Sequence, residues 1–588
     1  MQHSDTPTPR TGTTDAAASI PAPKAAPPEP LTTNTAPVDL VAVPANDTQV
    51  RTLATGGIPV QDAAGTGTAD PSPSTEPRAS VVPLFIGLMT TMLMAALSQT
   101  VLSAALPTIV GDLGGVDQMT WVVTSYLLAS TITMTIYGRL SDQFGRKPLL
   151  LIAISLFMGG SVIGALAGNI WWLVGARVMQ GLGGGGLMIL SQACIADVVP
   201  ARERGKYVGF MGAVFAVSSV AGPLLGGWIT EGPGWRWAFW MNLPLGILAL
   251  AAVIAFLHLP KRHVGAGAKI DYLGMSLLAA ATTTLVLMCT WGGHTYDWCS
   301  PEIIGLGLAT VAISAIFAYV ETRAAHPVVP LHMFTDRNFT LTTVAAAMIG
   351  VAMFGALGYF PTYLQMVTGL GPTESGLLLV PMMAGMLVTA VATGRLVTKT
   401  GRYKIYPIVG ALVMTLGLWL LSTLHTDSAV WWMCAVLAIF GIGLGLSNQI
   451  LTLIVQNSFP HAIVGTATAA NNYFRQVGAT VGSAVVGSLF VQRLQEFWAE
   501  RMAGLGAGAA GSGGASMRSL TPELVSTLPA PLHDAIIGAY NEALLPIFLM
   551  MVPLGIATFV LLCFVHEAPL KTTVEDVVPA SLSDPVAD

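Results

Sequence analysis

The feature that most constrains this chain is a succession of apolar blocks, each close to the length of a membrane-spanning helix. Only 10% of its 588 residues are charged, against about 25% in an average soluble domain. An α-helix needs about 20 apolar residues to cross a bilayer. The sequence therefore predicts an all-α polytopic membrane protein with fourteen transmembrane helices. Their approximate ranges are 82-104, 119-138, 148-168, 171-196, 206-229, 237-258, 272-291, 302-320, 339-366, 374-394, 405-423, 429-453, 463-490 and 543-565.

The two ends of the chain lack such blocks. Residues 1-80 contain 13 of the 37 prolines and no aromatic residue, so they cannot bury a hydrophobic core. We expect a disordered cytoplasmic tail there and a second cytoplasmic tail over residues 571-588. The connection 491-541 is long and rich in Gly and Ala, and we expect it to be an extracellular loop.

Lysine and arginine alternate between the connections. Connections of one parity hold most of the basic side chains, whereas short ones of the other parity, such as "GALAGN" and "LHTDSA", hold almost none. Because cytoplasmic connections carry an excess of Lys and Arg, both termini are predicted to lie in the cytoplasm of a multi-pass plasma-membrane protein. The basic residues placed inside are Arg139, Arg146, Lys147, Arg202, Arg204, Lys206, Lys261, Arg262, Lys269, Lys399, Arg402 and Lys404.

The chain also repeats itself. The segment "GRLSDQFGR" at residues 138-146 returns as "GRLVTKTGR" at residues 394-402, an offset of 256. Over residues 171-227, tryptophans, glycines and a proline match residues 260 positions later. Chance does not keep one register over such a length, so we infer two related halves of six helices each.

The offset leaves about 80 residues beyond what six spanning helices need, which predicts two inserted helices between the halves. Parallel six-helix repeats with the substrate path between them are the construction of many secondary transporters. The predicted organisation is an N-terminal bundle over 81-260, an insert over 261-338 and a C-terminal bundle over 339-570.

The segment "RVMQGLGGGGLMIL" at residues 177-190 has two interpretations. Gly181, Gly183 and Gly186 satisfy G-x-G-x-x-G, the fingerprint of a dinucleotide-binding loop. No strand precedes the segment, however, and the fingerprint is weak without a strand-turn-helix context. Gly181 and Gly185 instead form a ridge of small residues that lets a neighbouring membrane helix approach closely, and we favour this interpretation.

A second small-residue surface lies in "GPLLGGW" at residues 222-228. Gly222 and Gly226 are four positions apart, Gly227 follows, and Pro223 removes a backbone donor. The segment is either a kinked packing helix or a kink at which one bundle rocks against another. Together with the neighbouring motifs, we favour rocking.

Several of these motifs resemble one family. "GRLSDQFGRKP", "RVMQGLGGGG" and "GAVFAVSSVAGPLLGGW" resemble signature motifs of the major facilitator superfamily. "WRWAFWMNLPLG" and "YFPTYLQMVTGLGPTESGLLLVP" are similar to its fourteen-spanner drug-proton antiporter branch. The resemblance covers residues 81 to about 572. It implies a major facilitator fold and export by alternating access, without covalent chemistry or a cofactor.

The resemblance also implies a conformational latch at Gly138, Asp142, Gly145 and Arg146. A carboxylate beside a helix start stabilises the positive end of that helix, and an Asp-Arg pair there would hold one conformation. The alternative is a helix cap combined with a positive-inside anchor. Because the second copy of the motif has Thr398 in place of Asp142, the latch is expected to be asymmetric.

Arg177 is predicted to lie inside the membrane, about 7 Å of helix rise from the boundary at Trp172. An arginine at such depth marks a functional site by default, although its side chain could also reach the outer surface. The matching position in the second half is Leu437, so packing alone does not demand an arginine. The resemblance implies a part in proton coupling for Arg177, and we add Asp197 as a second candidate charge.

One expected group is missing from the first helix. The antiporter branch usually carries an acid there in a pattern like L-D-x-T-I-V, and this chain has Ser98 in its place. No Asp or Glu lies near the middle of any predicted span, which puts proton coupling in question. The remaining polar residues at depth are candidates for a substrate cavity or for hydrogen bonds between helices. They are Ser98, Gln99, Tyr126, Gln180, Asn471, Asn472 and Arg475.

These features predict a secondary active exporter of amphipathic drugs or toxic compounds, with protons and membrane lipids as further partners. The alternative is a lipid or lipid-precursor exporter with weak or no proton coupling, which the missing acid and the buried charges of Arg177 and Arg475 would suit. The net charge of -5 gives no basic field for nucleic acid. The sequence contains no G-x-x-x-x-G-K-[ST], H-E-x-x-H or G-x-S-x-G motif, so we expect no enzyme activity, metal or cofactor.

Overall fold

A computed structural model describes residues 81-114, 118-257, 270-293, 295-369, 372-505 and 529-570. In these ranges fourteen helical segments are long and apolar enough to cross a membrane, so the predicted number of spans and the all-α class are confirmed. The predicted tails, the basic connection with Lys261, Arg262 and Lys269, and the middle of the predicted loop 491-541 lie outside the described residues.

The helices follow one another with short connections. The first half contains α1 (Val81–Leu113), α2 (Met119–Phe144), α3 (Arg146–Ala165), α4 (Ile170–Val198), α5 (Ala201–Glu231), α6 (Trp237–Trp240) and α7 (Asn242–Phe256). The inserted pair is α8 (Tyr272–Trp291) and α9 (Pro301–Glu321). The second half contains the 3-10 helix η2 (Leu331–Thr335), α10 (Arg337–Thr368), α11 (Pro372–Leu377), α12 (Val380–Thr400), α13 (Ile405–Ser422), α14 (Val430–Ser458), α15 (Val464–Leu505) and α17 (Ala530–Cys563).

Short polar side chains and glycines set several helix ends. Asn169 accepts a hydrogen bond from the backbone N–H of Trp172 at 2.8 Å and so caps α4. Asp336 caps α10 through the N–H of Phe339 at 2.7 Å. Gly401 ends α12 with a φ of 73°, which a residue without Cβ adopts readily. The sequence therefore stops these helices locally.

The predicted loop 491-541 is helical at both ends, which corrects the sequence prediction. Helix α15 continues to Leu505 and α17 begins at Ala530. The two extensions pack against each other, with the rings of Phe490 and Tyr540 5.7 Å apart and Leu494 in the same core cluster. Polar residues on the other faces of these extensions lower their mean hydropathy, so they do not read as membrane spans.

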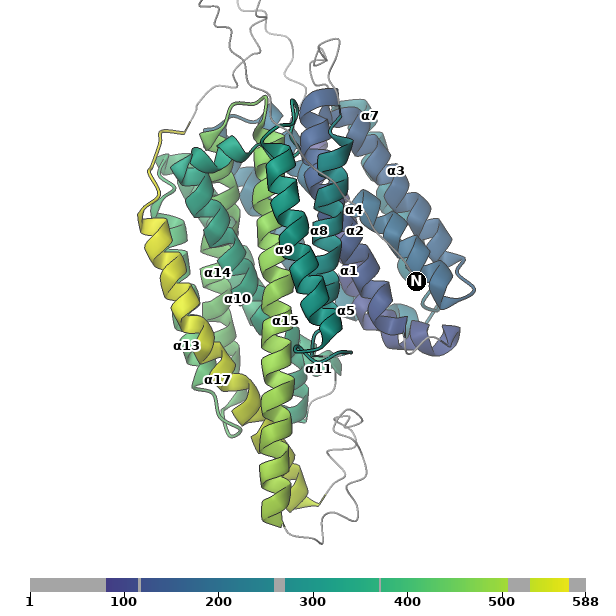
Figure 1. Ribbon diagram of the computed structural model, residues 1–588, viewed down its shortest axis with the longest axis vertical. Coiled ribbons are helices and arrows are strands. Elements are labelled where there is room, and N and C mark those ends of the chain that lie inside the picture. Colours follow the sequence, from purple (N-terminus) through teal and green to yellow (C-terminus); the bar gives the residue numbers. More distant parts are fainter. Residues whose placement is uncertain are drawn as a thin grey trace, which may run out of the picture. The chain divides into compact units, whose positions relative to one another are not determined.

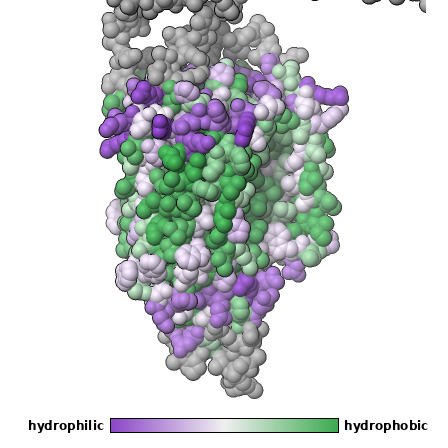
Figure 2. Space-filling view, turned by 90° about the vertical axis from the view of Figure 1, so that its left-hand side faces the viewer, coloured by the Kyte–Doolittle hydropathy of each residue, from purple (hydrophilic) through white to green (hydrophobic). Residues whose placement is uncertain are grey.

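Figure 1 shows the first half on one side, the second half on the other, and α8 and α9 in front of the region between them. Helix α8 contacts both halves. Thr282 shares a 2.9 Å hydrogen bond with the hydroxyl of Tyr473 on α15, and the ring of Trp291 lies 6.0 Å from that of Trp121 on α2. On the face drawn in Figure 2, apolar residues form a band between two hydrophilic margins. This pattern is typical of a surface that faces lipid.

Candidate functional site

The two halves meet where α2 crosses α15 and where α12 crosses α5. We call this the basic end of the bundle, because Arg146 and Arg204 lie there. A Cβ added to Gly138 would lie 3.0 Å from the carbonyl oxygen of Gly465, and one added to Gly205 would lie 2.7 Å from that of Gly394. The sequence offsets relate Gly138 to Gly394 and Gly205 to Gly465. The two crossings are therefore equivalent positions of the repeat, and both depend on glycine for a close approach.

One crossing is also held by a carboxylate. Asp142, at the end of α2, accepts hydrogen bonds from the backbone N–H groups of Gly465 at 3.3 Å and Thr466 at 2.7 Å. It accepts a third from the Thr466 hydroxyl at 2.8 Å. These groups belong to the first turn of α15, where unpaired N–H groups and the helix dipole favour a negative charge. A side chain of the first half thus caps a helix of the second half.

Arg146 completes this arrangement, which we call the clasp and define as Asp142, Arg146, Asp197, Gly465 and Thr466. The side chains of Arg146 and Asp142 are each 1% exposed, and Nη2 lies 3.1 Å from Oδ1. Arg146 also makes a two-point contact with Asp197 on α4, at 2.5 and 3.1 Å. One guanidinium therefore joins α2, α3 and α4 while its partner Asp142 reaches α15.

The backbone between α2 and α3 makes this geometry possible. Gly145 separates the two helices with a φ of 89° and a ψ of 154°, and its N–H donates to the carbonyl of Ser141 at 3.1 Å. Side chains with a Cβ are strained in that region. The turn places Arg146 four positions after Asp142, so both face the start of α15.

The second crossing lacks a charged clasp. Thr398 takes the place of Asp142, and its hydroxyl donates to the carbonyl of Gly394 on its own helix at 2.9 Å. Its oxygen lies 3.3 Å from a Cβ built at Gly205. The asymmetry expected from the two motif copies therefore appears as one charged and one uncharged crossing.

The first half contains a buried network around Arg177, whose side chain is fully buried. Its guanidinium donates to the side-chain oxygen of Gln180 at 2.8 Å and to that of Gln99 at 2.5 Å. It also donates to the carbonyl of Val122 at 3.2 Å and lies 4.1 Å above the Tyr126 ring. The alternative in which Arg177 reaches the outer surface is wrong, because three neutral acceptors hold it between α1, α2 and α4.

Two residues that the sequence analysis missed extend this network. Ser161 on α3 accepts a hydrogen bond from Gln180 at 2.8 Å. The side chain of Asn242, at the start of α7, donates at 3.2 Å to both Ser161 and Ser98. Asn242 lies within the segment "WRWAFWMNLPLG", which was used only for the family resemblance. Ser98 and Gln99 both join the network, but through different partners.

The glycines of α4 lie inside that helix and face its neighbours. Added Cβ atoms on Gly181 and Gly185 would lie 2.7 Å from Ala129 and 2.6 Å from the Thr133 hydroxyl oxygen, both on α2. The helix runs without interruption from Ile170 to Val198. The dinucleotide-loop interpretation is therefore wrong, since no loop exists at these glycines.

The glycines of α5 face α1, with one exception. An added Cβ on Gly222 would collide with Thr100, and one on Gly226 would lie 2.7 Å from Ala104. Nothing lies within 4 Å of a Cβ built on Gly227, which corrects its predicted packing role. One position along a helix is a rotation of 100°, and this turns Gly227 away from α1. Pro223 lies within the continuous helix α5 and is exposed.

The second half places an arginine among amides, a set that we call the amide cluster: Gln192, Asn448, Asn472 and Arg475. Arg475 donates to the side-chain oxygen of Asn448 on α14 at 2.6 Å and to that of Asn472 on its own helix. Asn472 donates in turn to Gln192 on α4 at 3.2 Å. The cluster therefore spans both halves. Asn471 is not part of it and instead donates to Thr343 on α10 at 3.3 Å.

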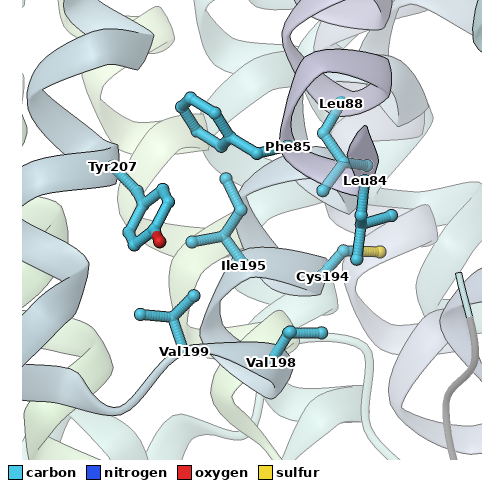
Figure 3. Close-up of a pocket in the computed structure, with 8 residues that line it drawn as sticks. All are labelled: Leu84, Phe85, Leu88, Cys194, Ile195, Val198, Val199 and Tyr207. Atoms are coloured by element: carbon cyan, nitrogen blue, oxygen red, sulfur yellow. The ribbon is translucent and has the colours of Figure 1, made fainter. Parts of the chain in front are cut away.

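Figure 3 shows a small cavity between α1, α4 and α5 near the basic end. Its volume is about 10 Å³, the size of a single water at most. Aliphatic and aromatic groups dominate its wall, so it offers a water few polar partners. The lining residues are Leu84, Phe85, Leu88, Cys194, Ile195, Val198, Val199 and Tyr207. This cavity does not hold an amphipathic ligand, and the amide cluster is the better candidate for contact with one.

A sequence model of the Major Facilitator Superfamily matches residues 88-483. The chain belongs to this superfamily. The relatives of this major facilitator protein include an uncharacterised MFS-type transporter of Mycobacterium tuberculosis strain CDC 1551, 39% identical over 497 residues, or 84% of this chain and 70% of the relative. Multidrug resistance protein 3 of Bacillus subtilis is 32% identical over 507 residues, or 85% of this chain and 98% of the relative.

Solved structures agree on the fold of this major facilitator protein. The human organic anion transporter MFSD10 aligns with a TM-score of 0.56 at 14% identity, covering 83% of this chain and all of its own. The proton:xylose symporter XylE aligns with a TM-score of 0.53 at 18% identity, covering 84% of this chain and 97% of its own. Identities this low show the major facilitator fold alone. The family resemblance inferred from the motifs is confirmed, and the family is one of transporters.

Proposed function

We propose that this chain exports amphipathic drugs or toxic compounds from the cytoplasm across the plasma membrane by alternating access. The observation that carries the proposal is the pair of equivalent helix crossings at the basic end, one of them fastened by the clasp. Such an end can close by glycine contact and reopen when Asp142 leaves α15. Relatives named multidrug transporter and multidrug resistance protein support drugs as the cargo.

In this proposal the basic end faces the cytoplasm, as the alternation of basic residues predicts, and both termini lie on that side. The structure then represents a state closed toward the cytoplasm. Gly222 and Gly226 let α1 and α5 move as one unit, and the crossings of α2 with α15 and of α5 with α12 are the contacts that break. Opening moves the amide cluster from one access side to the other.

Proton coupling is a second part of the proposal. Arg177 has neutral partners, and Ser98 occupies the place of the first-helix acid. We assign the coupling carboxylates to Asp142 and Asp197, whose side chains are 1% and 11% exposed. Adding a proton to Asp142 removes the charge that caps α15, so protonation weakens the closed state. A proton gradient can therefore bias the two states.

Dye export from everted vesicles tests both parts. Ethidium uptake driven by an imposed pH gradient, present in expressing vesicles and absent from empty ones, is the expected result. Asp142→Asn and Asp197→Asn should each reduce the gradient-dependent part. Expressing vesicles that match empty ones over a broad panel of dyes would contradict drug export. Equal uptake with and without the gradient would remove the coupling assignment alone.

A second candidate function is export of a lipid or lipid precursor with weak or no coupling. The observation in its favour is that neither Arg177 nor Arg475 forms an ion pair with a described carboxylate, so an anionic head group would be accommodated. A deletion strain with altered outer-leaflet lipids and ordinary drug tolerance would favour this candidate over drug export.

A further inference from the structure

Arg475 lies at the depth at which transporter substrates bind. It is eleven residues after Val464, the first residue of α15, which is about 16 Å of helix rise. The hydrocarbon core of a bilayer is about 30 Å thick, so Arg475 lies close to the midplane. Sites for substrates and coupling ions in secondary transporters concentrate at this level.

The helical positions around Arg475 indicate what its side chain faces. Asn472, one turn earlier on the same face, contacts Gln192 of the first half. Tyr473 points to the other side of α15, where it contacts Thr282 of α8. Arg475 therefore faces the space between the two halves. It is partly exposed there, whereas Asn472 at the closed contact is 2% exposed.

The guanidinium of Arg475 keeps donors and a charge to spare. Described residues accept from two of its N–H groups, and both acceptors are neutral amide oxygens of Asn448 and Asn472. A guanidinium has five N–H donors in a planar fork. In the described part of the chain it forms no ion pair. The amides hold the fork in place without cancelling its charge.

Arg177 differs from Arg475 in both respects. Its side chain is fully buried, and it uses acceptors on Gln180, Gln99 and Val122 as well as the ring of Tyr126. It is part of the internal frame of the first half. Arg475 is the arginine with an open approach.

Packing does not explain Arg475. The repeat matches Arg475 to Phe215, Asn448 to Met188 and Asn472 to Gly212, all at the offset of 260. The same framework in the first half thus functions with apolar or small residues at all three places. A cation at the midplane is costly unless a partner offsets its desolvation, and the substrate itself can supply that partner.

We propose that the amide cluster is a binding subsite for the oxyanion of an amphipathic substrate, with Arg475 as the charged contact and Asn448 and Asn472 as positioning residues. This rests on the proposed export function and adds a substrate class to it: compounds with a carboxylate, sulfonate or phosphate on an apolar body. The planar fork of arginine matches two oxygens of such a group. Cationic compounds lack a counter-charge at this site.

The test uses one apolar body with three head groups: pyrenebutyrate, pyrenebutanol and pyrenebutylammonium. Binding to the purified full chain in detergent is measured by pyrene fluorescence. We expect pyrenebutyrate to bind at least about tenfold more tightly than pyrenebutylammonium. Arg475→Gln should weaken pyrenebutyrate binding by about tenfold to a hundredfold and leave pyrenebutanol unchanged. Arg475→Lys should retain part of the preference.

Arg323→Gln is the matched control, because Arg323 is exposed and its guanidinium lies 4.8 Å from the Tyr319 ring outside the cluster. It should leave all three affinities unchanged. Equal binding of the three compounds by the wild type, or an Arg475→Gln variant that still prefers pyrenebutyrate, would overturn the proposal. Size-exclusion profiles identify variants that fail to fold, and Arg475→Lys then carries the comparison.

Two further arms separate the source of the oxyanion and the fate of the export function. Competition by phosphatidylglycerol vesicles against pyrenebutyrate would support the subsite and assign it to a lipid head group. Competition by soluble organic anions alone would support it and assign it to small molecules. Transport of pyrenebutylammonium by proteoliposomes without any binding preference would refute the subsite while leaving export intact. Binding of pyrenebutyrate without transport of any compound would support the subsite and refute export.

Discussion

Replacing Asp142 with asparagine tests whether the clasp holds the basic end closed. Asparagine keeps the size of the side chain and remains a good helix cap, so the main loss is the charge. Asp142 accepts three hydrogen bonds from Gly465 and Thr466 and pairs with Arg146. Hydrogen bonds to a charged group contribute about 1.5–3 kcal/mol each, against about 1 kcal/mol for neutral ones.

The retained cap and the second carboxylate, Asp197, limit the damage. Arg146 keeps its two-point contact with Asp197, so the full 3–5 kcal/mol typical of a broken buried pair is not lost. We expect Asp142→Asn to weaken the closed state by about 2–3 kcal/mol. This shifts the equilibrium toward the open basic end by about 30-fold to 150-fold.

Accessibility of a cysteine at position 134 measures this shift. Met134 is 7% exposed and packs against Ala469 of α15, so it is covered only while α2 and α15 are in contact. In a Met134→Cys chain whose five natural cysteines are replaced by alanine, a maleimide added to everted vesicles should react at least about tenfold faster after Asp142→Asn. Asp336→Asn is the control, because Asp336 caps its own helix at Phe339. An unchanged rate in the Asp142→Asn chain would refute the role of the clasp.

Three further predictions follow from the same contacts. Gly205→Ala should lower transport, because its Cβ would lie 2.7 Å from the Gly394 carbonyl oxygen, whereas Gly227→Ala should leave dye efflux unchanged; equal rates in the two variants would contradict the crossing. Arg177→Lys should lower the melting temperature by several degrees, because an ammonium cannot serve three fixed acceptors in the plane of a guanidinium; thermal unfolding in detergent measures this, and an unchanged midpoint would refute it. Ser98→Asp should make dye export more responsive to an imposed pH gradient, because it adds a carboxylate to a buried polar network; vesicle transport with and without the gradient is the measurement, and an unaltered response would count against it.

The features that could be predicted from the sequence are those fixed by local composition. The spans were found because apolar length is read along the chain, and the glycines of the crossings because the repeat marks them. The partners of Arg177 could not be found in this way, since they depend on how α1 and α4 are rotated about their axes. Ser161 and Asn242 are ordinary small polar residues in their own helices. Only the packing of α3 and α7 gives them a role.

Asp142 illustrates the same limit. A carboxylate beside a helix start was expected to act on its neighbour in sequence, and Gly145 does separate it from the start of α3. In the structure the helix that Asp142 caps is α15, more than 300 residues further along the chain. The charge preference of a helix start is a local property, but which start lies nearest is decided by the meeting of the two halves.

The inequality of the two crossings gives the repeat a direction. Glycine contacts such as those of Gly138 and Gly205 are weak individually and have no strong preference between states, so a protein with only these could rock with little bias. A charged clasp at both crossings would add the cost of breaking two buried ion networks to every cycle. With a charge at Asp142 and a hydroxyl at Thr398, one crossing sets the bias and the other yields. Gain of a carboxylate at Thr398 should therefore slow opening of the basic end, and its effect should be opposite in sign to that of Asp142→Asn in the same cysteine-accessibility measurement.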